Sequence, residues 1–180
     1  MTQQKDKLKV IIAQTKSYIL EDLERALSSN PSISGFYTTD PAEALEEIRK
    51  NEANMLITGQ MFYGTRDISD PIKDVIATLR YACDWARESL YLEEYLRNGN
   101  ELAAVARKAN PELLTLRFSS TPESKDHLCG DVSKREQGLY LFNLLTDPQL
   151  QKAIKKHKLS ELPQMSGVSW YKENFHKSWS

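Results

Sequence analysis

The chain has 180 residues, of which 40% are hydrophobic and 27% charged, and its 24 Lys and Arg against 25 Asp and Glu give a net charge of -1. This length and hydrophobic fraction fit one core-forming domain with additions, and the charge balance argues against nucleic acid or an anionic membrane as partner. No apolar run approaches the ~20 residues of a membrane-spanning helix, and residues 1–10 lack the apolar core of a signal peptide. The two cysteines, Cys83 and Cys129, make no disulfide framework. We therefore expect a cytoplasmic protein.

The first sixty residues alternate between strand and helix patterns. Residues 8–14 (LKVIIAQ) form a β-branched run typical of a strand buried on both faces. Asp40 is placed to cap a helix that has Pro41 at its first position. The predicted order is strand 8–14, helix 17–30, weaker strand 32–39, helix 41–52 and strand 54–58. This alternation indicates a parallel sheet with right-handed crossovers.

The alternation of strand and helix patterns ends after Tyr63. Residues 69–100 carry an apolar stripe at helical spacing and indicate one long helix or two shorter ones. The later pattern predicts a helix over 100–110, a fourth strand over 112–120, a short fifth strand over 126–133, and a helical region over 135–158 that bends or breaks near Pro148.

This order resembles a receiver domain, the response-regulator module of two-component signalling. The most specific stretch runs from Gly99-Asn100-Glu101-Leu102 through Arg107 and Asn110-Pro111 to Ser119-Ser120, and it resembles the third helix and fourth strand of a receiver. The resemblance implies a flavodoxin-like α/β fold with a doubly wound, parallel, five-stranded sheet. The domain would span residues 1–158, with 65–98 as a helical insertion after strand three and 159–180 as a C-terminal extension.

The same resemblance implies a phosphorylation site at the carboxyl edge of the sheet. Receivers accept a phosphoryl group on an aspartate that ends strand three, beside a Mg²⁺ held by two acids after strand one. A hydroxyl residue ending strand four and a lysine ending strand five contact the phosphoryl group. By position, these roles fall on Ala13 and Gln14 for the acid pair, Gly59 for the acceptor, Ser119 or Ser120 for the hydroxyl, and Lys134 or Lys125 for the lysine.

The first three of these positions lack the required carboxylates. Gly59 cannot form an acyl phosphate, and its neighbours Thr58 and Gln60 are not acids either. A hard divalent cation prefers carboxylate oxygens, which Ala13 and Gln14 do not supply. The hypothesis is therefore a pseudo-receiver that is not an enzyme, holds no cofactor or metal, and regulates a protein partner such as a kinase or an effector.

A second hypothesis keeps chemistry at the same edge. A small-ligand-binding protein or enzyme could use Ser119, Ser120, His127 and Lys134 there. His127, Cys129 and Asp131 alternate along one strand and would share a face, but a zinc site usually shows two close-spaced ligand pairs.

Two further segments suggest partner surfaces. The stripe of the insertion includes Leu79 and Leu90, and it either buries against the domain or forms an interface such as that of a homodimer. The C-terminal extension holds four aromatic residues that fold back on the domain or dock on a partner: Trp170, Tyr171, Phe175 and Trp179. The basic run Lys155 to Lys158 complements the negative end of a helix dipole.

Overall fold

A six-stranded sheet forms the centre of the molecule in the computed structural model, which describes residues 7–50, 53–60, 62, 96, 98–119, 127–156 and 158–175. The strands are β1 (Leu8–Ala13), β2 (Ile33–Thr38), β3 (Met55–Thr58), β4 (Leu114–Ser119), β5 (Gly130–Ser133) and β6 (Val168–Trp170). Their spatial order is β2-β1-β3-β4-β5-β6. The first five are parallel, and β6 runs antiparallel to β5 at the edge.

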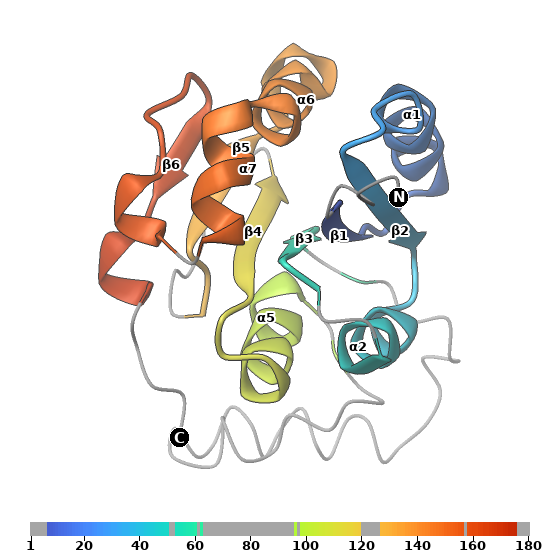
Figure 1. Ribbon diagram of the computed structural model, residues 1–180. Coiled ribbons are helices and arrows are strands. Elements are labelled where there is room, and N and C mark those ends of the chain that lie inside the picture. Colours follow the sequence, from blue (N-terminus) through green and yellow to red (C-terminus); the bar gives the residue numbers. More distant parts are fainter. Residues whose placement is uncertain are drawn as a thin grey trace, which may run out of the picture.

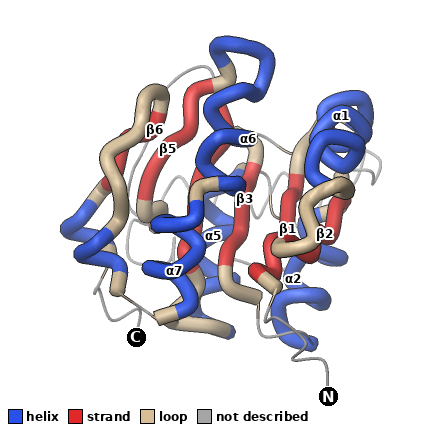
Figure 2. Tube along the Cα trace, turned by 45° about the horizontal axis from the view of Figure 1, so that its top comes forward, coloured by secondary structure: helices blue, strands red, loops and turns tan. Residues whose placement is uncertain are grey.

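Helices cover both faces of the sheet (Figures 1 and 2). They are α1 (Ser17–Leu27), α2 (Pro41–Lys50), α5 (Gly99–Ala109), α6 (Leu139–Thr146) and α7 (Pro148–Lys155), with short 3-10 turns η2 (Arg135–Gly138), η3 (Leu159–Glu161) and η4 (Lys172–Asn174). One core cluster joins α1, α6 and α7 to the first face, and a second joins α2 and α5 to the other. No helix in the described part of the chain is long and apolar enough to cross a bilayer.

Short polar side chains define where three helices begin. The carboxylate of Asp40 accepts from the backbone N–H of Ala42 at 2.8 Å before α2. Asn98 accepts from Glu101 N at 2.9 Å and caps α5, and Asp147 accepts from Leu150 N at 2.7 Å and caps α7. These contacts satisfy N–H groups that the first helical turn leaves without an intrahelical partner. The break between α6 and α7 thus lies at the Asp147 cap, next to the proline where the sequence predicts it.

The C-terminal extension supplies the sixth strand, so the predicted count of five strands is wrong. Residues 120–129 link β4 to β5, fewer than the dozen or more that a parallel crossover usually needs. The segment after β6 covers this part of the sheet. Tyr171 donates its backbone N–H to Cys129 O at 2.8 Å and packs with Leu128 and Ala103 of α5. Residues 168–175 therefore belong to the folded domain.

Both ends of the predicted insertion meet at one place, although most of it lies outside the described residues. Phe62 and Leu96 are buried in the same core cluster between α2, α5 and the sheet. Gly99 N donates to Gln60 O at 3.1 Å. A β-carbon on Gly99 would lie 2.0 Å from the carbonyl oxygen of Gly59, so only glycine allows α5 to start this close to the end of β3. The described residues on either side of this segment therefore lie close together near the carboxyl end of β3.

Candidate functional site

The carboxyl edge of the parallel sheet brings the predicted site positions together. Ala13, which ends β1, is paired in register with Thr58 at the end of β3, and its carbonyl accepts from Gly59 N at 2.8 Å. At the other side of the edge, Lys134 N donates to Ser119 O at 3.2 Å. The positions predicted from four different strands are therefore neighbours along one edge.

Gln14 lies beside the end of β3, where the acceptor aspartate of a receiver is expected. Its side chain is 1% exposed and Ala13 is fully buried. A β-carbon built on Gly59 would lie 3.0 Å from Gln14 Oε1, which is tighter than an ordinary contact. The amide of Gln14 thus packs against Gly59, and no carboxylate comes from either residue.

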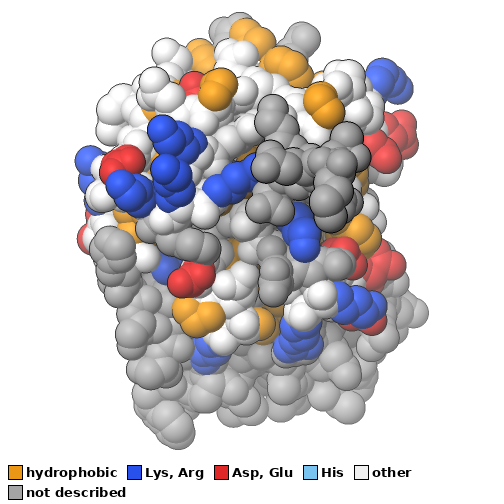
Figure 3. Space-filling model, in the orientation of Figure 1, with side chains coloured by type: hydrophobic (Ala, Val, Ile, Leu, Met, Phe, Trp, Pro, Cys, Tyr) orange, Lys and Arg blue, Asp and Glu red, His pale blue; other side chains and the backbone are white. Residues whose placement is uncertain are grey.

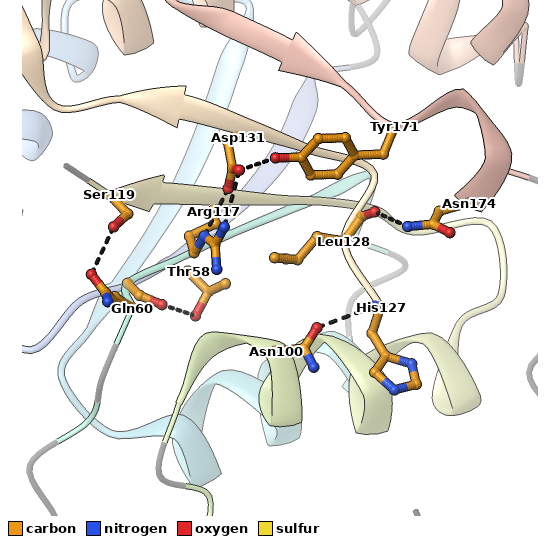
Figure 4. A network of polar contacts seen from close by, with 11 residues as sticks. Thr58, Gln60, Asn100, Arg117, Ser119, His127, Leu128, Asp131, Tyr171 and Asn174 are labelled. Carbon is orange, nitrogen blue, oxygen red and sulfur yellow. Dashed lines mark hydrogen bonds and ion pairs between the residues drawn. The ribbon is translucent and has the colours of Figure 1, made fainter. Parts of the chain in front are cut away.

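Ser119 at the end of β4 is already hydrogen-bonded. Its hydroxyl donates to Gln60 Oε1 at 2.9 Å, and the residue is 8% exposed (Figure 4). This contact ties the end of β4 to the segment that follows β3. Ser120 and Lys125 lie outside the described residues.

Lys134 follows β5 and places its ammonium group above an aromatic ring. The distance from Lys134 Nζ to the centroid of the Phe118 ring is 5.3 Å. Burial lowers the pKa of the Lys134 amine, and the nearby positive charge of Lys16 lowers it further. Lys16 precedes α1, so two positive charges lie close together at this edge.

A buried polar network occupies the α5 face of β4 and β5. Arg117 is 2% exposed and forms a two-pronged ion pair with Asp131, with Nε to Oδ1 at 2.7 Å and Nη2 to Oδ2 at 3.0 Å. The hydroxyl of Tyr171 donates to the same carboxylate (Figure 4). Burial and the negative charge of Asp131 raise the pKa of Tyr171. The network joins two strands to the C-terminal segment.

The sequence offers one signal for this network. Arg117 interrupts an otherwise apolar strand, and Asp131 is its register partner on β5. A charged residue in a buried strand requires a partner of opposite charge. Tyr171 carries no comparable signal, because its contact depends on where the extension folds.

Arg107 of α5 forms a second buried contact beneath this network. Its guanidinium donates to Cys129 Sγ at 3.2 Å and to the carbonyl of Asn174 at 2.9 Å. The carboxylate of Asp131 is engaged by Arg117 and Tyr171, and Cys129 is fully buried. Among the described residues, no three His, Cys, Asp or Glu side chains are grouped as metal ligands, so nothing in this region supports the zinc alternative of His127, Cys129 and Asp131.

Three aromatic residues of the extension that the structure describes pack against the domain: Trp170, Tyr171 and Phe175. Tyr171 and Phe175 are each 6% exposed and pack in core clusters, which is the first of the two arrangements that the sequence allows for these residues. Trp170 is half-buried, donates its indole N–H to Pro163 O at 2.9 Å and meets the Phe175 ring edge-on. The remaining predicted partner-binding residues, Leu79, Leu90 and Trp179, lie outside the described residues.

A basic group of side chains lies apart from the carboxyl edge. It consists of Lys152, Lys155 and Lys156 at the end of α7 together with Lys158. Basic side chains gather over α7 in the surface view (Figure 3). Lys158 bonds Glu161 at 2.8 Å, and positive charges at this helix end oppose its negative dipole, which explains the group without a ligand.

Comparison with known proteins identifies the fold. No family model matches the chain, and no curated protein matches it either. Among solved structures, the CheY-like response regulator receiver domain protein of Methanospirillum hungatei JF-1 matches with a TM-score of 0.55 at 10% identity, over 86% of this chain and 99% of that one. The signal receiver domain of an HD domain-containing protein of Pseudomonas fluorescens Pf-5 gives 0.53 at 14% identity, over 84% and 97%.

The chain has the fold of a response-regulator receiver domain. A two-component response regulator of the LuxR family from Aurantimonas sp. SI85-9A1 also matches, with a TM-score of 0.50 at 12% identity, over 86% of this chain and 99% of that one. The flavodoxin-like α/β architecture predicted from the sequence is thereby confirmed. Relative to the predicted receiver sheet, this chain adds β6.

Proposed function

We propose that this chain is a phosphorylation-independent receiver-like domain that regulates another protein by direct contact. The observation that carries the proposal is the packing of the Gln14 amide against Gly59, at the position where the receiver resemblance implies an aspartate. The receiver fold supports a role in signal transduction. At the position where a receiver has its phosphoryl acceptor, this chain has Gly59.

The residues at the edge do not fit a magnesium ion. Mg²⁺ is held in proteins through carboxylates and keeps several waters. Ala13, Gln14 and Gly59 supply no carboxylate, and Lys16 and Lys134 place positive charge at the same edge. A divalent cation would be repelled there, so we derive no phosphoryl-transfer step.

Exposed apolar side chains near this edge favour contact with a partner. Tyr18 is 57% exposed near the start of α1, and Leu139 is 51% exposed at the start of α6. The lysines of the edge are close in sequence to both, since Lys16 precedes α1 and Lys134 precedes the turn that leads into α6. Together they form a mixed apolar and basic surface, which suits an acidic partner surface with exposed apolar groups.

Phosphorylation is tested by incubating the intact chain with acetyl phosphate and Mg²⁺ and measuring its mass. We expect no added phosphoryl group, whereas a phosphorylatable receiver treated in parallel should gain one. A stoichiometric adduct on this chain would contradict the proposal.

Partner contact is tested by affinity capture from cells that express the chain, followed by measurement of the affinity of each captured protein. The variants Tyr18→Ser and Leu139→Ser should stay folded and weaken the complex by about tenfold or more, as loss of central apolar contacts does. Lys108→Ser, at the opposite end of the sheet, is the matched control and should bind normally. Equal binding by all three variants would remove this surface from the proposal.

A further inference from the structure

β2 forms one edge of the sheet and carries none of the features that usually block an edge strand. It lies between α1 and α2 and, among the described strands, pairs only with β1 (Figure 1). Natural proteins protect such edges with charged residues, prolines, bulges or very short strands. The six residues of β2 include no charge and no proline, and their register with β1 is unbroken. At the opposite edge, β6 has only three residues.

The backbone groups of alternate β2 residues point away from β1. Leu8 N donates to Ser32 O at 2.8 Å, and the parallel register is continuous from there to the end of β2, so the even-numbered residues of this segment face β1. Gly35 and Tyr37 therefore direct their N–H and C=O groups outward. No described residue forms a hydrogen bond with these four groups. They are available to pair with an added strand.

The side chains of β2 leave this backbone edge accessible. Ser34 and Gly35 are exposed, whereas Phe36 and Tyr37 are half-buried. The Tyr37 ring lies along its own strand, because a β-carbon built on Gly35 would collide with it. Phe36 packs against the core cluster of α2 and α5 on the other face. The two rings therefore lie on the faces of the sheet and do not cross its edge.

A hollow adjoins the edge on the α2 face. Its volume is about 180 Å³, and its lining includes Ser34 and Phe36 of β2 together with Lys9 and Glu47. The charges of Lys9 and Glu47 are opposite, so they balance where a second, identical surface would approach. The hollow thus offers room beside Phe36 for an apolar side chain of an added strand.

We propose that two copies of this chain associate by antiparallel pairing of their β2 strands, with Phe36 opposite Phe36 of the second copy. A two-fold axis through this pair places each Gly35 opposite Tyr37 of the other copy. Residues paired in this way exchange two hydrogen bonds, so every outward N–H and C=O of Gly35 and Tyr37 gains a partner. The result is one continuous sheet across both copies, with the closed symmetry that is commonest among homo-oligomers.

The spacing of the outward residues selects a second copy as the occupant of this edge. Gly35 and Tyr37 flank Phe36, so a two-fold axis at Phe36 exchanges them. A register centred on Gly35 would instead place Ile33 opposite Tyr37, and Ile33 N is already bonded to Asn30 O at 3.2 Å. An aromatic pair at the axis and an aromatic residue opposite an edge glycine both favour the register centred on Phe36. This interface goes beyond the proposed function and does not depend on it.

Amide hydrogen exchange and sedimentation of the full chain, over roughly 1 µM to 1 mM, test the pairing. The N–H groups of Gly35 and Tyr37 should exchange slowly in samples that sediment as a dimer and fast in samples that sediment as a monomer. The N–H group of Phe36 faces β1 and should be protected in both. A chain that stays monomeric up to roughly 1 mM would overturn the proposal. So would a dimer with fast exchange at Gly35 and Tyr37, or their protection in a monomer, which would mean that the chain covers its own edge.

A matched pair of lysine substitutions assigns the interface to β2. Ser34→Lys adds to β2 the charge that protected edges carry, and it should weaken dimerisation about tenfold or more. Ser169→Lys makes the same change on β6 at the other edge and should dimerise like the parent chain. Both serines are exposed, so both variants should stay folded. Equal dimerisation by the two variants would overturn the proposal.

NMR on a mixture of isotope-labelled and unlabelled copies tests the register. The α-hydrogens of Phe36 in the two copies should be in contact, because facing residues that exchange no hydrogen bonds approach most closely in an antiparallel pair. A dimer without this contact would overturn the register centred on Phe36.

Discussion

Replacing Phe175 with alanine tests whether the C-terminal segment is an integral part of the domain. The ring is 6% exposed, belongs to the core cluster of α1, α6 and α7, and meets the Trp170 ring edge-on with centroids 6.3 Å apart. Truncating a buried phenylalanine costs ~3–5 kcal/mol, and losing an aromatic pair accounts for about 0.5–1.5 kcal/mol of such an effect. We expect Phe175→Ala to lower the free energy of unfolding by about 3 kcal/mol.

Urea unfolding followed by circular dichroism and tryptophan fluorescence measures this loss. Phe175→Leu keeps most of the apolar volume and should cost only about 1 kcal/mol. The exposed neighbour Lys172 is the matched control, and Lys172→Ala should change stability by no more than ~0.5 kcal/mol. A loss below about 1 kcal/mol for Phe175→Ala would refute the reasoning, because it would mean that the segment does not contribute to the core.

Three further predictions follow from the packing. Gly99→Ala should destabilise the chain by ~1–3 kcal/mol or more, because the added β-carbon would collide with the backbone. Gly59→Ala should cost less, because there the closest atom belongs to the flexible Gln14 side chain. Equal thermal midpoints for the two variants would contradict this prediction. The pKa of Tyr171 is raised in the folded chain, so the stabilisation from its phenol is complete below the ordinary pKa of 10.0 and is lost as pH rises above that value. The urea midpoint of Tyr171→Phe should therefore fall less steeply above pH 10.0 than that of the parent chain. Parallel pH profiles for the two proteins would contradict this prediction. A chain in which a short Gly-Ser linker replaces residues 65–95 should still fold and unfold cooperatively. Phe62 and Leu96 already lie in one core cluster, and the length of a connecting loop changes stability by only ~0.6 kcal/mol per doubling. Loss of cooperative unfolding would show that the replaced residues are part of the core.

Most of the sheet could be predicted because its strands carry local signals. The runs that became β1, β3 and β4 are apolar enough to indicate strands buried on both faces. β6 has no such signal: Val168–Trp170 spans three residues, and its middle residue is the exposed Ser169. Pairing with β5 rather than local preference makes this segment a strand, so a sequence pattern alone could not reveal it.

The position of the candidate site could be predicted from the sequence, but the contacts between its side chains could not. Because parallel strands end at the same edge, the residues after β1 and β3 had to meet the end of β5. The absence of acids was visible in the sequence as well. The role of Gln14 was not, because its buried amide and its contact with Gly59 depend on side-chain packing.

The position of β6 has a consequence for synthesis of the chain. Ribosomes release the N-terminal part first, so β1 to β5 can assemble while residues 168–175 are still inside the exit tunnel. Until that segment emerges, β5 is an unpaired edge strand, and such edges invite pairing with other chains. The nascent protein therefore has an open sheet edge at β5 until Val168–Trp170 pairs with that strand, and an open edge favours aggregation.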